Sequence, residues 1–135
     1  MAKAVAQKGK QLEIVTTNEP GTGAKIFGAM KDARINVKAS CIWEDGDGKA
    51  HFWIVPEDLV GARNLLRKAG FKPLTKEAVF IELPNRVGAL ADVLEKIASA
   101  GIQCKVSYAT AATKKSALVV LTTSSDARAV RAINA

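Results

Sequence analysis

The sequence predicts an α+β protein made of two ferredoxin-like βαββαβ units in tandem, the second without its last strand. Three observations predict this class: an internal repeat, the same order of strand and helix signals in both copies, and a globular composition. The 135 residues are 48% hydrophobic and 24% charged, which excludes wholesale disorder. A chain of this length holds one ordinary domain or two very small ones.

The internal repeat has an offset of 67 residues (85 − 18). Asn18-Glu19-Pro20-Gly21 aligns with Asn85-Arg86-Val87-Gly88, and the offset then holds without a gap through the next two elements. We expect one inserted residue after that point, so that Asp58 aligns with Asp126. A register kept over this distance indicates a duplication.

In the first copy, apolar residues alternate where strands are expected and follow helical spacing where helices are expected. The predicted elements are a strand over 12–16, a loop over 18–23, a helix over 26–33, a strand over 35–43, a hairpin turn over 45–48, a strand over 50–55 and a helix from Pro56 to Gly70. Residues 71–77 are compatible with a fourth strand.

The second copy repeats this order. Its predicted elements are a strand over 79–83, a helix over 90–97 that stops at Gly101, strands over 102–110 and 116–122, and a helix over 125–133. The predicted boundaries are therefore an N-terminal segment (1–9), a first domain (10–78) and a truncated second domain (79–135).

The missing fourth strand leaves an open edge in the second sheet, unless another strand covers it. The N-terminal segment Ala2–Lys8 is one candidate to do so. The strands Ala50–Val55 and Ala117–Leu121 are also apolar on both faces, which predicts that the helix-free faces are covered by the sibling domain or by another subunit. We therefore expect a homo-oligomer, a dimer.

The loop between the first strand and the first helix of each copy is the candidate for chemistry. A glycine there lets the backbone turn tightly, and the free N–H groups of a first helical turn favour an anionic group such as a carboxylate. Asn18 and Asn85 carry both a donor and an acceptor, which suits an α-amino acid. On physical grounds alone, helix capping is the favoured explanation of these asparagines.

Residues 83–90 (Leu-Pro-Asn-Arg-Val-Gly-Ala-Leu), followed by Ala100-Gly101-Ile102, resemble the opening of an ACT domain, a small βαββαβ regulatory module that binds amino acids. Residues 18–23 with 33–37 resemble a second copy. The resemblance implies ligand sites between paired ACT domains, with the loop and helix start from one domain and the second strand from its neighbour. The residues it implicates are Asn18, Glu19, Gly21, Thr22, Gly23 and Asn36 in the first copy, and Asn85, Arg86, Val87, Gly88, Ala89 and Gln103 in the second.

The two copies are not identical at these positions. Gln103 is longer by a methylene than the matching Asn36, and Gly23 stands where the second copy has Leu90. Arg86 either pairs with a ligand carboxylate or is solvated.

The remaining polar and sulfur-containing residues favour no other chemistry. We expect Cys41 and Cys104 to be packing residues on the apolar face of their strands, and His51 to be a strand residue without an acid partner. One histidine and two cysteines without metal-ligand spacing predict no metal, and no cofactor motif is present.

The leading hypothesis is thus a cytoplasmic, non-catalytic sensor whose ligand is a small amino acid. The alternative is a nucleic-acid-binding module on the same fold, since the formal charge is +7, but the aromatic pattern of RNA-recognition sheets is missing. No nucleophile–base pair or phosphate-binding loop indicates an enzyme. No apolar run approaches the roughly 18–20 residues that span a membrane.

Overall fold

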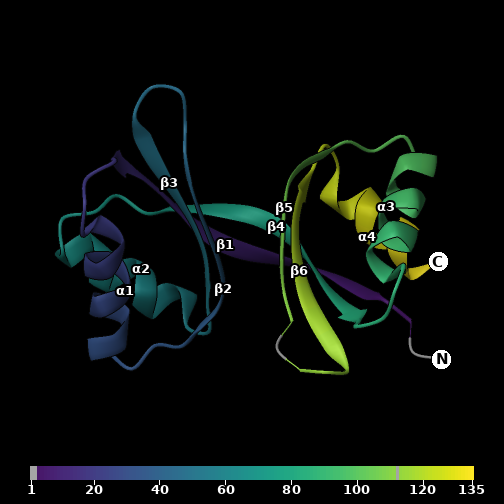
Figure 1. Cartoon of the computed structure of the whole chain (residues 1–135), viewed down its shortest axis with the longest axis horizontal. Helices are drawn as coiled ribbons and strands as arrows, with labels where there is room; N and C mark the ends of the chain where they lie inside the picture. The colour runs from purple at the N-terminus through teal and green to yellow at the C-terminus, as the bar shows by residue number, and fades with distance from the viewer. Residues whose placement is uncertain (1–2, 112) are drawn as a thin grey trace. The chain divides into compact units, whose positions relative to one another are not determined.

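The computed structural model describes residues 3–111 and 113–135 (Figure 1). Its elements in chain order are β1 (Val5–Thr17), α1 (Thr22–Asp32), β2 (Val37–Glu44), β3 (Lys49–Pro56), α2 (Leu59–Lys68), β4 (Leu74–Pro84), α3 (Ala89–Ser99), β5 (Cys104–Thr110), β6 (Ser116–Thr123) and α4 (Asp126–Asn134). This order confirms the predicted α+β class and its duplicated βαββα core.

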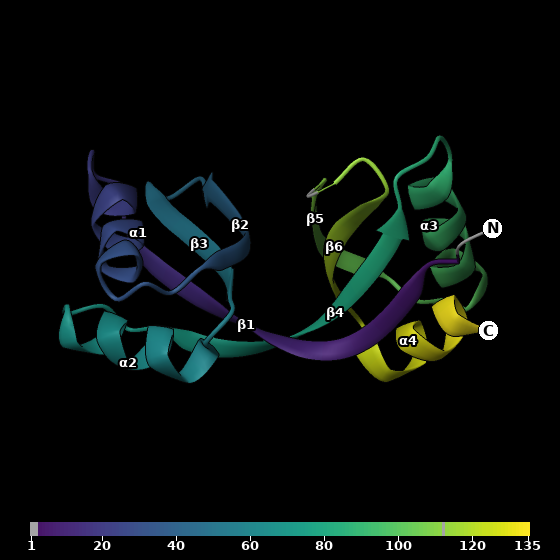
Figure 2. The same ribbon diagram turned by 90° about the horizontal axis from the view of Figure 1, so that it is seen from below.

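The chain divides into two compact units. The first unit is Lys10–Lys76, and the second unit joins the described residues of Met1–Gly9 to Glu77–Ala135. The long strands β1 and β4 each contribute residues to both units. Within each unit, two helices cover one face of an antiparallel sheet, as Figure 2 shows.

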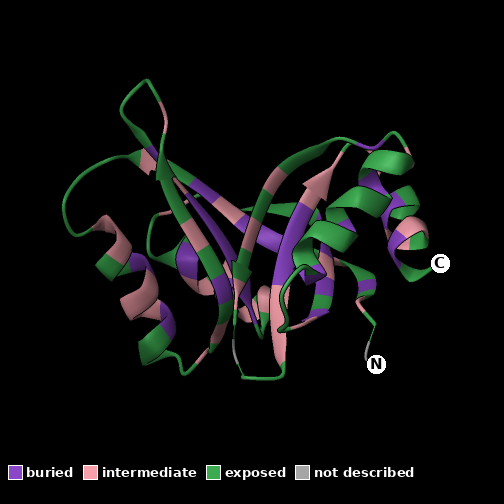
Figure 3. Cartoon of the chain, turned by 45° about the vertical axis from the view of Figure 1, so that its right-hand side comes forward, coloured by how far each residue is buried: buried purple, intermediate pink, exposed green. Residues whose placement is uncertain are grey.

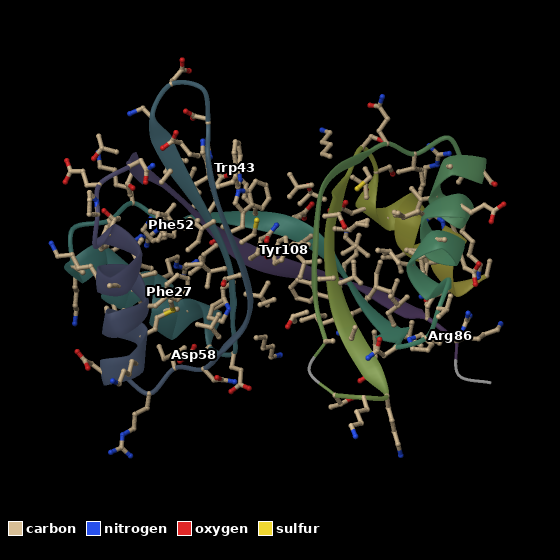
Figure 4. The ribbon with its side chains drawn as sticks, viewed as in Figure 1. Phe27, Trp43, Phe52, Asp58, Arg86 and Tyr108 are labelled. Atoms are coloured by element: carbon tan, nitrogen blue, oxygen red, sulfur yellow. The ribbon has the colours of Figure 1, made fainter. Side chains whose placement is uncertain are left out.

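The core of the first unit lies between α1, α2 and the sheet. In the sheet, β3 pairs with β1 on one side and β2 on the other, with Leu12 opposite Ile54 and Ile14 opposite Phe52. The Phe52 ring packs against that of Phe27 on α1, with centroids 6.5 Å apart (Figure 4). The cluster of buried residues comprises Leu12, Ile14, Ile26, Met30, Ala50, Phe52, Ile54, Ala62 and Leu66.

The second unit repeats this arrangement with β4, β6 and β5. Val79 lies opposite Leu121 and Ile81 opposite Val119, and all four side chains are buried in a core that includes residues of α3 and α4. Figure 3 shows the buried stretches of the chain in purple. The rest of this core comprises Ala6, Leu83, Ala89, Val93, Ile97, Ile102, Ala129 and Ile133. Burial of each large aliphatic side chain stabilises the unit by roughly 1.5–3 kcal/mol.

The open edge of the second sheet is covered by the N-terminal segment. Residues Val5–Gly9 belong to β1, which lies beside β4, and Ala6 is part of the second core. The amide of Asn134 at the end of α4 binds the backbone of Ala6 twice, accepting from its N–H at 2.8 Å and donating to its C=O at 2.9 Å. A Cβ at Gly9 would overlap the ring of Phe80. The sequence predicted that Ala2–Lys8 covers this edge, and Ala2 lies outside the described residues.

The structure corrects the element boundaries at three points. The expected strands over 71–77 and 79–83 are one continuous strand, β4. Pro56 ends β3 and does not open α2, which begins at Leu59 after an Asp58 N-cap. The insertion expected before the last helix is absent, because the N-caps Asp58 and Ser125 keep the 67-residue offset (125 − 58).

The prediction that both cysteines pack in the core is wrong. Cys104 is exposed, and Cys41 is half-buried opposite Trp53, on the face without helices. The register shift between Val37 and Ala39 explains the error for Cys41, whereas Cys104 is the first residue of β5 and precedes the shift in that strand. A bulge inserts one residue and moves every later side chain of the strand to the other face.

Candidate functional site

The two predicted loops have the same backbone conformation in the structure. Gly21 precedes α1 with φ of 89°, and Gly88 precedes α3 with φ of 85°. Both are left-handed N-caps, a conformation that glycine adopts without the penalty that a Cβ imposes. The αL backbone turns the strand sharply into the helix and carries no capping side chain at either position.

Each loop leaves backbone donors unpaired at the start of its helix. The N–H of Thr22 bonds to the Glu19 carbonyl at 3.3 Å, and that of Lys25 bonds to the Gly21 carbonyl at 3.0 Å. Between them, the N–H groups of Gly23 and Ala24 have no acceptor among residues 3–111 and 113–135. These donors lie at the positive end of the helix dipole, where an anionic group is stabilised.

The second loop repeats this pattern at the expected offset. The N–H of Ala89 bonds to the Arg86 carbonyl at 3.3 Å and that of Asp92 to the Gly88 carbonyl at 3.0 Å. The N–H groups of Leu90 and Ala91 have no acceptor within the described part of the chain.

The two asparagines do not cap the helices. Asn18 donates its side-chain amide to Glu44 at the end of β2, and its backbone N–H bonds to the Gly48 carbonyl at 3.2 Å. Asn85 donates its side-chain amide to the Thr113 carbonyl at 3.4 Å and its backbone N–H to the Lys115 carbonyl at 2.9 Å. Both asparagines thus fasten the loop to the neighbouring β-hairpin, so the capping alternative is wrong.

The charges that flank the loops are reversed between the copies. In the second unit, the Arg86 guanidinium pairs with the Asp92 carboxylate at 3.3 Å, and both side chains are exposed. The matching residues of the first unit are Glu19 and Lys25. An exposed pair of this kind contributes about 0–1 kcal/mol, so its main consequence is a different charge pattern beside each helix start.

The second loop also differs in its side chains. Val87 is 98% exposed, and Leu90 is 38% exposed on the first turn of α3. In the first unit, Gly23 of α1 is the residue that matches Leu90, so this position of the first turn has no side chain. A Cβ at Gly23 would contact the Phe52 ring at 3.4 Å.

The structure does not bring Asn36 and Gln103 to the loops of their own units. Asn36 donates to the Glu57 carboxylate at 3.2 Å and accepts the Glu57 N–H at 2.9 Å, before α2. The backbone N–H of Gln103 donates to Ser124 Oγ at 3.0 Å, and the Gln103 carbonyl accepts the Ser124 N–H at 2.9 Å, before α4. Within each unit these residues lie at the end of the sheet opposite the loop, since Val37 pairs with Pro56 while Thr17 pairs with Lys49.

Sequence reasoning missed an acid partner for His51. The Nε2 atom of His51 lies 2.8 Å from Asp45 Oδ2, and its ring stacks on Trp43 with centroids 4.1 Å apart. The His51 hydrogen bond lowers the pKa of Asp45, assisted by the backbone N–H groups of Lys49 and Asp47. The signal was the turn at Asp45, because a turn aspartate accepts from the backbone two residues on, as Asp45 Oδ1 does from the Asp47 N–H at 2.8 Å.

Desolvation raises the pKa of the Cys104 thiol, which disfavours the nucleophilic thiolate. Among the described residues, no three His, Cys, Asp or Glu side chains are placed to hold a metal ion. No helix in the described ranges is long and apolar enough to span a bilayer.

Comparison with known proteins decides the family. A model for ACT domain pairs matches residues 8–134. The chain belongs to the ACT domain pair family. The resemblance seen in the two loops is thereby confirmed, and membership in a family of regulatory modules supports a ligand-binding regulatory role.

Solved structures show the same fold. A protein from Bacteroides thetaiotaomicron is similar with a TM-score of 0.87 and 26% identity, over 96% of this chain and 88% of that one. The ligand-free regulatory subunit of aspartate kinase from Thermus thermophilus has a TM-score of 0.70 and 15% identity, over 98% and 95%. Its counterpart from Thermus flavus has a TM-score of 0.66 and 17% identity, over the same shares. A search of curated protein sequences found no match.

Proposed function

We propose that this ACT domain pair is a non-catalytic sensor that binds a small amino acid at an interface between ACT domains. The observation that carries the proposal is the duplicated helix start, with a left-handed glycine followed by two unpaired N–H groups. Two adjacent donors at a helix N-terminus match the two oxygens of an α-carboxylate. The asparagine beside each loop fixes the loop to its hairpin, so the donors are held ready before the ligand arrives.

Binding acts by selecting one arrangement of the protein. A ligand that contacts two domains stabilises the geometry in which both contacts form, by its difference in affinity for the alternatives. The ligand thereby changes assembly or the affinity for a regulated partner.

We also propose that the sensor is a cytoplasmic homodimer. On the helix-free face of the first unit, Val15 is 43% exposed and Trp43 is 40% exposed, and both lie opposite His51 in the sheet. An exposed apolar row of this kind favours association. Light scattering on the purified chain tests this, and a monomeric mass at micromolar concentration contradicts it.

A thermal-shift screen against the standard amino acids tests the sensor. A ligand at about 100 times its dissociation constant adds about 2.7 kcal/mol to the free energy of unfolding. The test variants are Gly21→Ala and Gly88→Ala, because a Cβ at positive φ distorts the loop that presents the free N–H groups.

Gly70→Ala and Gly101→Ala are matched controls, since both positions have positive φ and open space where a Cβ would lie, but follow a helix. We expect the ligand shift to disappear in one or both test variants and to persist in the controls. Absence of any shift with every amino acid at millimolar concentration contradicts the proposal.

A further inference from the structure

The turn between β2 and β3 of the first unit, residues 44–49, holds the first candidate loop. Glu44 accepts the side-chain amide of Asn18, and the Gly48 carbonyl accepts the Asn18 N–H at 3.2 Å. Asn18 lies just before Gly21, the left-handed glycine at the start of α1. A displacement of this loop therefore reaches the turn through two hydrogen bonds.

Asp45 connects the same turn to the helix-free face of the sheet. Its Oδ1 atom accepts the N–H groups of Asp47 at 2.8 Å and Lys49 at 3.1 Å, and these bonds fix the turn. Its Oδ2 atom lies 2.8 Å from His51 Nε2. That hydrogen bond is the main cause of the lowered pKa of Asp45, so the carboxylate is ionised at neutral pH. One carboxylate oxygen thus binds the turn, and the other binds His51.

His51 extends the connection to an exposed aromatic side chain. Its ring stacks on that of Trp43 with centroids 4.1 Å apart and planes 10° apart. Trp43 is 40% exposed and points away from α1 and α2 (Figure 4). The Nδ1 atom of His51 is buried and has no hydrogen-bond partner among the described residues. The orientation of the imidazole therefore depends on Asp45 and on the stack with Trp43.

The second unit has an equivalent turn without this connection. Its Thr113 Oγ1 atom accepts the N–H groups of Lys115 at 3.1 Å and Ser116 at 2.9 Å, as Asp45 Oδ1 does in the first unit. A hydroxyl has no second oxygen atom that could bind a neighbouring strand. At the 67-residue offset, the residues that match Asp45, His51 and Trp43 are Ala112, Leu118 and Thr110.

The duplication shows that the fold does not require this connection. The second unit forms the same antiparallel pairing with Leu118 and Thr110 opposite each other, at the positions that His51 and Trp43 occupy in the first. A carboxylate, an imidazole and an exposed indole in series are therefore particular to the first unit. They lie between a candidate ligand loop and an exposed surface, which is the place of a contact that links the two.

We propose that Asp45, His51 and Trp43 relay the position of the first loop to the helix-free face of the first unit, and that the second loop has no such relay. The use of the relay rests on the proposed function, in which the first loop binds a ligand and Trp43 belongs to the apolar row that forms the dimer contact. A ligand at the first loop then changes association, and a ligand at the second loop does not do so through its turn. Coupling between two sites typically changes an affinity by about 5–150-fold.

The indole N–H resonance of Trp43 in the ¹⁵N-labelled full chain, without any added ligand, tests the relay. Gly21→Ala perturbs the first loop, and Gly88→Ala is the matched perturbation of the second, because both glycines have positive φ. We expect the Trp43 resonance to shift in Gly21→Ala and to stay in place in Gly88→Ala. In a His51→Leu background, which has the side chain found at the matching position of the second unit, we expect the effect of Gly21→Ala on Trp43 to fall at least fivefold.

Coupling is reciprocal, so a change at His51 must also reach the loop. We expect His51→Leu to shift the amide resonances of residues 21–24. The control is Leu118→Val in the second unit, which is expected to leave the amide resonances of residues 88–91 unchanged. If His51→Leu does not fold, Asp45→Ser replaces it, because a hydroxyl retains one acceptor for the turn, as in Thr113, and removes the contact with His51.

Sedimentation equilibrium measures the consequence for association. We expect Gly21→Ala to change the dimer dissociation constant at least fivefold in the wild type and less than twofold in the His51→Leu background. An effect of Gly21→Ala on Trp43 that is equally large with and without His51 overturns the relay, and so does an equal effect of Gly88→Ala. No amino acid is present in these measurements. A thermal-shift screen without a ligand therefore overturns the sensor alone, and the Trp43 resonance decides the relay even if the chain is monomeric.

Discussion

Among the described residues, a positive φ occurs at Arg34 and otherwise at glycines. Arg34 follows α1 with φ of 59°, and Gly101 occupies the matching position after α3 with φ of 72°. A non-glycine residue in the left-handed region destabilises the folded state by roughly 1–2 kcal/mol. Replacement by glycine recovers only part of this free energy, because glycine has greater conformational freedom in the unfolded state.

We expect Arg34→Gly to raise the free energy of unfolding by about 0.5–1 kcal/mol, measured by urea denaturation. The reverse change, Gly101→Arg, is expected to lower it by a similar amount. If Arg34→Gly destabilises the protein, then the Arg34 side chain makes a contribution that outweighs its backbone strain.

Asp45 makes stability depend on pH. Its folded-state pKa lies below the unfolded value of about 3.9, chiefly because of the His51 hydrogen bond. The carboxylate therefore stabilises the fold above that pH, and the contribution is lost as the pH falls through the folded-state pKa.

We expect the stability difference between the wild type and Asp45→Asn to shrink as the pH falls from 5 to 3. Chemical denaturation across this range measures the difference. Asp47→Asn is the control, because the Asp47 carboxylate accepts no hydrogen bond from the described residues. A difference for Asp45→Asn that stays constant down to pH 3 contradicts the role of the His51 bond.

At the scale of the element, the second helices of the two units begin differently. The Asp58 carboxylate accepts the N–H of Gly61 at 2.9 Å and caps α2, whereas Ser125 makes no side-chain cap for α4. The Asp126 carboxylate instead accepts from the Thr123 hydroxyl and N–H, which fixes the turn before α4.

This difference predicts unequal costs for equivalent substitutions. Asp58→Ala is expected to destabilise the protein by about 1 kcal/mol, and Ser125→Ala by a few tenths at most. Thermal unfolding of the two variants side by side measures both. Equal losses would mean that Ser125 caps α4 in solution.

At the scale of the whole chain, the second unit depends on a strand segment from the start of the sequence. Val5–Gly9 complete the second unit although more than sixty residues separate them from β4. Pairing between residues so distant in sequence has a cost in loop-closure entropy, and this cost grows slowly with loop length. Burial of Ala6 and the two hydrogen bonds to Asn134 offset the cost.

Removal of residues 1–9 is expected to destabilise the second unit by at least about 2 kcal/mol, since two hydrogen bonds of 0.5–1.5 kcal/mol and the burial of Ala6 are lost. Hydrogen exchange is expected to accelerate in β4 at Val79–Leu83 and to change little in β3. Equal protection of β4 with and without the segment contradicts this prediction.

Local rules determined much of this protein before any coordinates. Two equivalent helix starts were predicted from the glycines and asparagines of residues 18–23 and 85–88 and from the apolar spacing that follows them. The repeat predicted the element order. Both predictions were possible because turn chemistry and periodicity act over a few residues. The loop glycines followed from these signals, whereas the ACT family was indicated by the resemblance of residues 83–90 and 100–102 to the opening of an ACT domain.

Tertiary structure alone decided the rest. A bulge after Val37 reversed the faces of Cys41 and Trp43, and β4 joined two expected strands into one. The Asn18 and Asn85 side chains hydrogen-bond to the neighbouring hairpins and not to the N–H groups of the helices. The His51 ring hydrogen-bonds to Asp45 in the preceding turn. Each of these outcomes is a competition between alternatives of similar local energy, and packing with residues distant along the chain determines which one prevails.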